Sequence, residues 1–358
     1  MNLVTALAIA ATWIAALIVV LAVATAARRL SRTAIGGRRA AGVAHLRPAL
    51  IALIAGDDGA EVRRALDVRP SVLERAVADL LPRVRGDGYE ALTRLLEERG
   101  IVDRTLRRSR HGGALARAAA AEMLGWIGLS RTLPALARLL DDPDREVVAV
   151  AARALGRLGD AAAVPFLLAR LEDGMLTPGQ VAGALRHIGG DAADRLAAYC
   201  SHVNPDVRLV ATQVLSRIAG PTHTRVLVDA LYDPVRSVRV SAAQALGRIG
   251  DPRAAPALLV ALSGDDPRLR TRAAAALGEI GDESALPGLT AAVEDRDIDV
   301  SRAAAQALSA FEPEGHASLE ALAGTWPTAA EALARARLGV TARQRGAVST
   351  LALRDEIA

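Results

Sequence analysis

The sequence contains few residues of the kinds that bind metals or act as nucleophiles, and their spacing does not group them. Six histidines stand far apart, none begins a His-x-x-x-His pair, and Cys200 is the single cysteine. A zinc site made of protein ligands needs such pairs. Cys200 lies near His202 without a third group to orient them. All 44 basic residues are Arg, which excludes a phosphate-binding loop that requires Lys. We therefore predict a protein that is not an enzyme, with no catalytic residue, metal or cofactor.

Arginines and aspartates recur at a regular distance along the chain. Arg208, Arg239 and Arg270 are separated by 31 residues, and each follows an apolar residue. Turn positions carry Asp142, Asp233 and Asp295, and only Asp233 with Arg239 places both types in one repeat. The Arg series is interrupted at Val148, Pro178 and Ser301. Such a series could either stabilise the fold or grip an acidic partner or phosphates.

A second series lies two residues before the end of each repeat. Its members are Trp126, Arg157, His187, Arg217, Arg248 and Glu279. Near a helix C-terminus, Arg complements the helix dipole, which is a purely structural role. Trp126 beside arginines is also typical of a protein-binding anchor, although a tryptophan can equally belong to the core. We take Trp126, Arg157, His187, Arg217 and Arg248 as candidate partner-binding residues.

Both series follow an internal repeat. Ala-Ala-Arg-Ala-Leu-Gly-Arg-Leu-Gly-Asp at 151–160 recurs with small changes at 242–251 and 273–282. The closing positions are 128, 159, 189, 219, 250, 281 and 312, so successive distances are 30 or 31 residues. Each period begins with Pro in an apolar segment, passes an Asx-Pro turn and ends in an Ala-rich segment closed by Gly. Pro suits a first helical turn and Gly a helix end. The period predicts two helices per repeat.

These units resemble HEAT repeats of the short type found in phycobilin lyases, with the pattern Asp-Pro-x-x-x-Val-Arg…Ala-Ala-x-Ala-Leu-Gly-x-Ile-Gly-Asp. The resemblance is best over 129–311. It implies an all-α, right-handed solenoid of about seven helix pairs. It also implies that Asp233, Arg208, Arg239 and Arg270 form a structural ladder between repeats. HEAT-fold hydroxylases carry His-Glu dipeptides for a di-iron centre, and this sequence has none.

The N-terminal segment differs in composition from the rest of the chain. Residues 1–27 carry no charge, and the apolar run 3–27 is long enough to cross a bilayer. Six arginines follow within 28–47, which predicts that the chain after the span lies in the cytoplasm. Removing them leaves 38 arginines against 40 acidic residues, so the remainder is weakly acidic and disfavours nucleic-acid binding. Five of the six are candidate ligands for anionic lipid headgroups: Arg28, Arg29, Arg32, Arg38 and Arg39.

The predicted organisation is a transmembrane helix at 1–27, a basic linker at 28–47, an irregular helical part at 48–128, regular repeats at 129–312, and a cap helix with a tail at 313–358. Val72, Leu73, Val77, Leu80 and Leu81 indicate one helix of the irregular part, and Ala329 to Leu338 should form the cap helix. The predicted function is a membrane-anchored cytoplasmic scaffold for another protein, for example an integral membrane glycosyltransferase. The alternative is a lyase or chaperone for a bilin or another tetrapyrrole.

Overall fold

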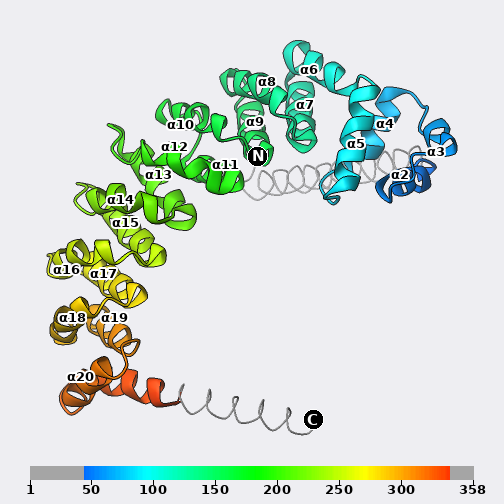
Figure 1. The fold of residues 1–358 in the computed structure, drawn as a ribbon. Helices are drawn as coiled ribbons and strands as arrows, with labels where there is room; N and C mark the ends of the chain where they lie inside the picture. Colours follow the sequence, from blue (N-terminus) through cyan, green and yellow to red (C-terminus); the bar gives the residue numbers. More distant parts are fainter. Residues whose placement is uncertain (1–43, 339–358) are drawn as a thin grey trace, which may run out of the picture. The chain divides into compact units, whose positions relative to one another are not determined.

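The computed structural model describes residues 44–338, and these form two compact units that divide between His111 and Gly112. All regular elements of the described residues are helical (Figure 1). The prediction of an all-α fold is therefore confirmed for this part of the chain. Among the described residues, no helix is both long and apolar enough to cross a bilayer. The predicted span and its basic linker lie outside the described residues, apart from the end of that linker.

The described residues of the first unit, 44–111, contain five helices. They are α2 (Arg47–Ile54), α3 (Ala60–Ala65), α4 (Pro70–Ala78), α5 (Asp87–Glu98) and α6 (Ile101–His111). Leu73, Val77 and Leu81 are completely buried, as their apolar stripe predicts, and so are Leu92 and Leu96 of α5. Ion pairs at the surface join α6 to α4, through Arg108 and Glu74, and the end of α5 to Asp67.

The second unit is a regular array with an outer and an inner layer of helices. In Figure 1 this arrangement is clearest for α16 and α18 on the outer side and for α17 and α19 on the inner side. The inner layer consists of α7 (Ala114–Ile127), α9 (Arg145–Leu158), α11 (Pro178–Ile188), α13 (Pro205–Ile218), α15 (Arg236–Ile249), α17 (Pro267–Ile280) and α19 (Ile298–Leu308). The outer layer consists of α8 (Leu133–Arg138), α10 (Val164–Glu172), α12 (Ala193–Ala197), α14 (Thr224–Ala230), α16 (Ala255–Leu262), α18 (Leu286–Ala292) and α20 (Glu314–Leu322).

The ends of these helices follow from the residues that the repeat supplies. Pro134, Pro165, Pro256 and Pro287 each occupy the first turn of an outer helix. The closing Gly128, Gly159, Gly250 and Gly281 have φ between 65° and 74°, a left-handed conformation that glycine adopts at little cost. Asp160, Asp251 and Asp282 accept a backbone N–H at the start of the next 3-10 turn. Predicted and observed turn chemistry therefore agree.

The C-terminal part contains more structure than the sequence predicted. We expected one cap helix after Pro313, but α20 comes first and residues 327–338 then form a second helix. Ala329, Ala332 and Leu333 of the latter are buried. The apolar faces of this last pair therefore continue the array where the Gly-Asp motif of the repeat has been lost.

A second class of glycine sets the distance between inner helices. Gly125, Gly156, Gly247 and Gly278 lie inside helices rather than at their ends. A Cβ atom at these positions would come within 2.7–2.8 Å of an alanine Cα on the next inner helix, closer than carbon atoms pack. Our sequence analysis placed the glycines at helix ends, which is wrong for these four, because only the packing of neighbouring helices shows their role.

Candidate functional site

The ladder connects neighbouring repeats through partly buried Arg–Asp pairs. Nε of Arg208 donates to a carboxylate oxygen of Asp233 over 2.7 Å, and Nε of Arg270 donates to Asp295 over 2.8 Å. The pair of Arg117 and Asp142 repeats this geometry at the start of the array. In each pair the Asp lies 25 residues after the Arg, so the ion pair bridges one inner helix and the turn of the following repeat.

The same arginines also fix the turn that precedes their own helix. A terminal nitrogen of Arg270 donates to the carbonyl oxygens of Gly264 and Asp265, each over 3.0 Å. Arg208 bonds the carbonyls of His202 and Val203 in the same way. Every donor of the planar guanidinium can thus meet an oxygen, which makes burial of the charge tolerable. The geometry gives these residues a structural function.

Arg239 lies in the same repeat as Asp233, but the two side chains do not form an ion pair with each other. Arg239 donates to the backbone carbonyl of Asp233 over 2.8 Å, and its ion pair is with Asp266 over 3.2 Å. The physical reason is a shift of two residues between turns. Asp266 caps α17, so the position that matches Asp233 is Gly264, which has no carboxylate.

One interruption of the Arg series lies at another residue than the predicted one. The helix position that carries the ladder Arg is the fourth residue after the N-cap, and after the N-cap Thr177 this is the buried Val181, not Pro178. Ser301 interrupts the Arg series as predicted, and its hydroxyl lies 2.7 Å from that of Thr328 in the last helix, so this position still contacts the next helix pair. The spacing itself would have found Arg117, which lies 31 residues before Val148.

The ion pairs shift the ionisation of the ladder carboxyls. The hydrogen bonds from Arg117 hold the pKa of Asp142 below its usual value, and those from Arg270 do the same for the pKa of Asp295. The corresponding pKa values of Arg117 and Arg270 are raised, mainly by the same hydrogen bonds. The pairs therefore stay charged at neutral pH.

The second series lies on the inner layer and starts with a stacked pair. The guanidinium carbon of Arg157 on α9 lies 4.4 Å from the centre of the Trp126 ring on α7, a cation–π contact. Nε of Arg157 is buried without a hydrogen-bond partner, and burial lowers the pKa of this arginine. Arg157 forms no ion pair among the described residues, in contrast to the ladder arginines. The pair thus combines a partly covered aromatic ring with a cation that lacks a carboxylate.

The remaining members of the series continue along the inner layer but do not join the stacked pair. His187 is exposed and its Nδ1 lies 2.9 Å from the carbonyl oxygen of Gly183. Arg217 is exposed. Arg248 donates to backbone carbonyls at the end of α13, with Nε 2.6 Å from the oxygen of Ser216. Arg248 thus binds the C-terminal end of the preceding inner helix, α13, rather than that of its own helix. Glu279 reverses the charge of the series.

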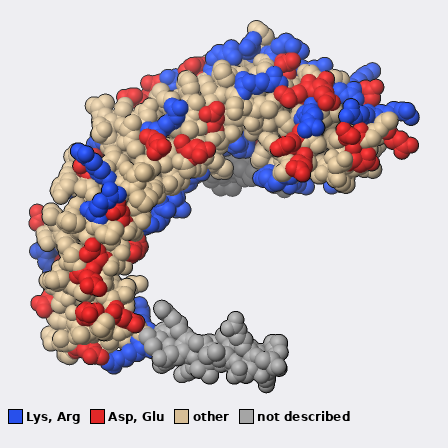
Figure 2. All heavy atoms as spheres, in the orientation of Figure 1, with Lys and Arg blue, Asp and Glu red and all other residues tan. Residues whose placement is uncertain are grey.

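Two exposed arginines near this series were missed from the sequence. Arg153 lies one helical turn before Arg157, and its nearest carboxylate oxygen, on Glu146, is 4.0 Å away. Arg186 precedes His187 and occupies the position that Gly156 and Gly247 hold in other repeats. Counting back from each closing residue would have identified both. Figure 2 shows basic side chains along the inner edge of the array beside α13 and α15.

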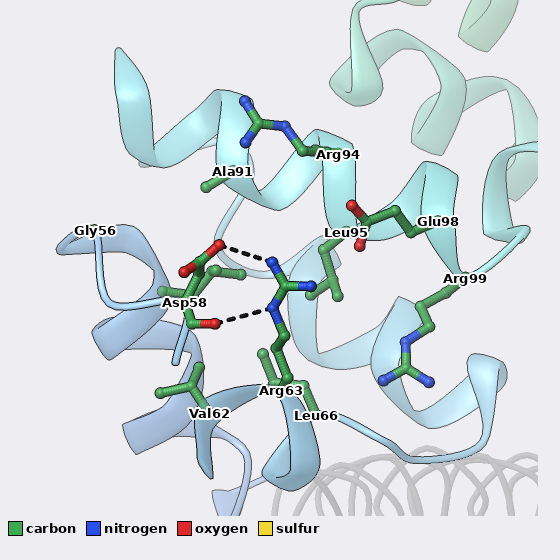
Figure 3. Close-up of a pocket in the computed structure, with 11 residues that line it drawn as sticks. Gly56, Asp58, Val62, Arg63, Leu66, Ala91, Arg94, Leu95, Glu98 and Arg99 are labelled. Carbon is green, nitrogen blue, oxygen red and sulfur yellow. Dashed lines mark hydrogen bonds and ion pairs between the residues drawn. The ribbon is translucent and has the colours of Figure 1, made fainter. Parts of the chain in front are cut away.

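The first unit has a pocket of about 350 Å³ between α3, α5 and the loop after α2 (Figure 3). Its charged groups largely neutralise one another. Arg63 bonds both the carboxylate and the backbone carbonyl of Asp58, at 2.8 and 2.9 Å, and Arg99 pairs with Asp67. Arg94 and Glu98 of α5 contribute opposite charges to the wall. The pocket therefore presents neither a net field nor a convergent set of donors.

Other groups give no support to catalysis within the described residues. The Cys200 thiol is buried, and burial raises its pKa to about 11, so it is not a thiolate at neutral pH. No cluster of metal-ligating side chains is found between residues 44 and 338. The candidate lipid ligands Arg28, Arg29, Arg32, Arg38 and Arg39 lie outside the described residues.

This fold and ladder define the class of α-solenoid repeat proteins. A family model described as HEAT repeats matches residues 104–175, 192–274 and 256–341, which is more than half of the chain. The chain belongs to the HEAT-repeat family. The unmatched segment 176–191 contains α11, the inner helix whose repeat departs most from the pattern. No curated protein matches the sequence.

Several solved structures are similar to this chain at low sequence identity. A mutant of Kap121p is 15% identical, with a TM-score of 0.50 over 77% of this chain and 36% of that chain. An engineered protein is 22% identical, with a TM-score of 0.42 over 76% of this chain and 85% of that chain. Human deoxyhypusine hydroxylase is 19% identical, with a TM-score of 0.31 over 76% of this chain and 97% of that chain. The chain spans about a third of the length of Kap121p, and this likeness shows the fold alone.

Proposed function

We propose that this protein is a non-enzymatic scaffold that binds another protein on the inner layer of its second unit. The observation that supports the proposal most directly is the pair of Trp126 and Arg157. Trp and Arg are the residue types most enriched where single side chains dominate binding energy. The charges of the ladder are already used, because its arginines and aspartates bind one another. HEAT arrays also offer an extended surface whose form does not depend on a bound ligand.

The proposal is tested by comparing partner capture by the full chain and by two variants of it. Trp126→Ala with Arg157→Ala should lose a partner that the wild-type chain recovers from detergent-solubilised membranes. Arg138→Ala with Arg225→Ala is the matched control, because both arginines are exposed on the outer helices α8 and α14. Retention of every specific partner by the first variant, with thermal stability unchanged, would contradict the proposed surface.

We further propose that residues 3–27 anchor the protein in the membrane, with the array on the cytoplasmic side. This proposal rests on the uncharged apolar run and on the arginines that follow it. The full chain should remain in the membrane fraction at alkaline pH and dissolve in detergent, whereas the variant Ile14→Arg with Ile18→Arg should become extractable. Extraction of the wild-type chain by alkali alone would refute the anchor. A glycosyltransferase partner stays a prediction, as does the tetrapyrrole alternative, and no feature of the described residues favours either.

A further inference from the structure

The inner layer of the second unit carries cations that no carboxylate neutralises. Among the described residues, Arg157, Arg186 and Arg217 form no ion pair, and Arg248 bonds neutral backbone carbonyls. These four residues, which we call the basic row, lie on the consecutive inner helices α9, α11, α13 and α15. By contrast, the ladder arginines Arg117, Arg208 and Arg270 each meet an Asp. The array thus pairs one set of arginines with aspartates and leaves another set without a carboxylate partner.

Acidic side chains mark the two ends of this row rather than its middle. Glu122 lies one helical turn before Trp126 on α7, and Glu279 on α17 occupies the position that Trp126 occupies on α7. Between them, the solvent-facing positions one turn earlier on α13 and α15 are the neutral Gln213 and Gln244. The aspartate nearest to Arg157 in sequence, Asp160, already accepts a backbone N–H as a cap. The four arginines of the basic row therefore lie between Glu122 and Glu279.

The spacing of the row selects the form of the ligand. Packed helices lie about 8–10 Å apart, and an extended chain advances about 3.3 Å per residue. Every third residue of an extended segment that crosses the inner layer would thus meet the next arginine. A guanidinium binds a carboxylate through two parallel N–H groups, so Glu or Asp at these positions would fit best. Trp126 ends the row with an apolar surface.

We propose that the basic row binds an extended acidic segment of the partner protein, with Glu or Asp at about every third residue. This inference rests on the proposed scaffold function and names the chemistry of its partner. The surface is less suited to single-stranded nucleic acid, which needs several aromatic rings for base stacking. The aromatic ring beside the basic row is that of Trp126, and Arg157 covers it.

The test measures binding of a fluorescent peptide to the full chain in detergent micelles. The peptide is about 12 residues long, with Glu at every third position and Gly or Ser between them, a length set by the extent of the row. Binding should saturate, and Arg157→Gln with Arg217→Gln should raise the Kd by at least about tenfold. Arg138→Gln with Arg225→Gln removes the same charge from the outer layer and should change the Kd by less than about twofold.

Three results would overturn the inference. Equal weakening by both pairs of substitutions would mean that the peptide responds to net charge alone. Tighter binding of an oligothymidine that is sensitive to the same inner substitutions would assign the row to nucleic acid. Absence of saturable peptide binding, while partner capture still depends on Trp126 and Arg157, would refute the acidic ligand and leave the scaffold proposal standing.

Discussion

Two interfaces inside the second unit are built differently although they lie one repeat apart. Between α9 and α11, Gly156 lets the backbone of Ala184 approach so closely that no Cβ would fit. At the matching position between α11 and α13, Gly is replaced by Arg186, a large exposed side chain. The ladder is absent there as well, since Val181 and His202 stand where Arg and Asp stand in the next repeat. One interface is held by close backbone contact, and the other lacks both devices.

The array is therefore not uniform along its length. A solenoid is stabilised by the sum of its neighbour interfaces, so an interface without a ladder pair or a Gly–Ala contact is where it should open first. The HEAT-family match is interrupted in the same repeat. The basic row crosses this interface, from Arg157 and Arg186 to Arg217 and Arg248, so a bound segment would bridge it.

The largest loss of stability is expected from breaking the ladder pair between Arg270 and Asp295. Asp295→Ala leaves the 6% exposed Arg270 without its carboxylate, and removing one partner of a buried pair costs about 3–5 kcal/mol. Glu294→Ala, which removes an exposed neighbouring carboxylate, should change stability by less than about 0.5 kcal/mol. Urea unfolding followed by circular dichroism measures both. Equal effects would show that the ladder adds nothing beyond surface charge.

A somewhat smaller change in stability is expected at Gly156, which contacts the next inner helix, and a change of opposite sign at Gly183, which does not. Gly156→Val forces a side chain against the Ala184 backbone, which lies 2.8 Å from the site of a Cβ, and overpacking typically costs about 1–3 kcal/mol. Gly183→Ala on α11 should instead stabilise by up to about 1 kcal/mol, because alanine is the better helix former and the only atom near its Cβ is 3.9 Å away. Thermal denaturation gives both signs. A stable Gly156→Val protein would disprove the close packing.

Acid should weaken the ladder in a defined direction. The pKa of Asp142 and the pKa of Asp295 are lower in the folded chain than the unfolded value of about 4. Their stabilisation is therefore complete above about pH 4 and is lost as the pH falls through the folded values. The urea midpoint should fall over this range, and the double variant Asp142→Asn with Asp295→Asn should show a smaller decrease. An identical decrease would assign the acid sensitivity to other groups.

The smallest effect is a change in the labelling rate of Cys200 beside the interface between α11 and α13. Cys200 lies before α13, buried, with its sulfur 3.7 Å from the hydroxyl oxygen of Thr212, and its pKa of about 11 leaves little thiolate at pH 8. Maleimide labelling should be slow in the native protein and should accelerate at urea concentrations below the global transition. Labelling that rises only with global unfolding would mean that this interface opens no earlier than the others.

The sequence by itself determined the class of fold and the place of nearly every helix of the array. Pro at helix starts, Gly at helix ends and a period of 30 or 31 residues act locally, so they can be read without coordinates. The same reasoning identified most ladder residues and the series that contains Trp126 and Arg157. It missed the ladder residue Arg117 and the first helix of the last pair, α20, where the motif is lost but the apolar faces remain.

Which side chains and helices come into contact depends on the packing between repeats, so it required the tertiary structure. A shift of two residues in a turn makes Asp266 a helix cap instead of a ladder residue, although both positions read as Asp-Pro in the sequence. Contact between helices, not local geometry, separates Gly156 from the closing Gly159. Whether an arginine is neutralised depends on an oxygen 25 residues away in the next repeat, because charge pairing acts through space and the repeat pattern records only distance along the chain.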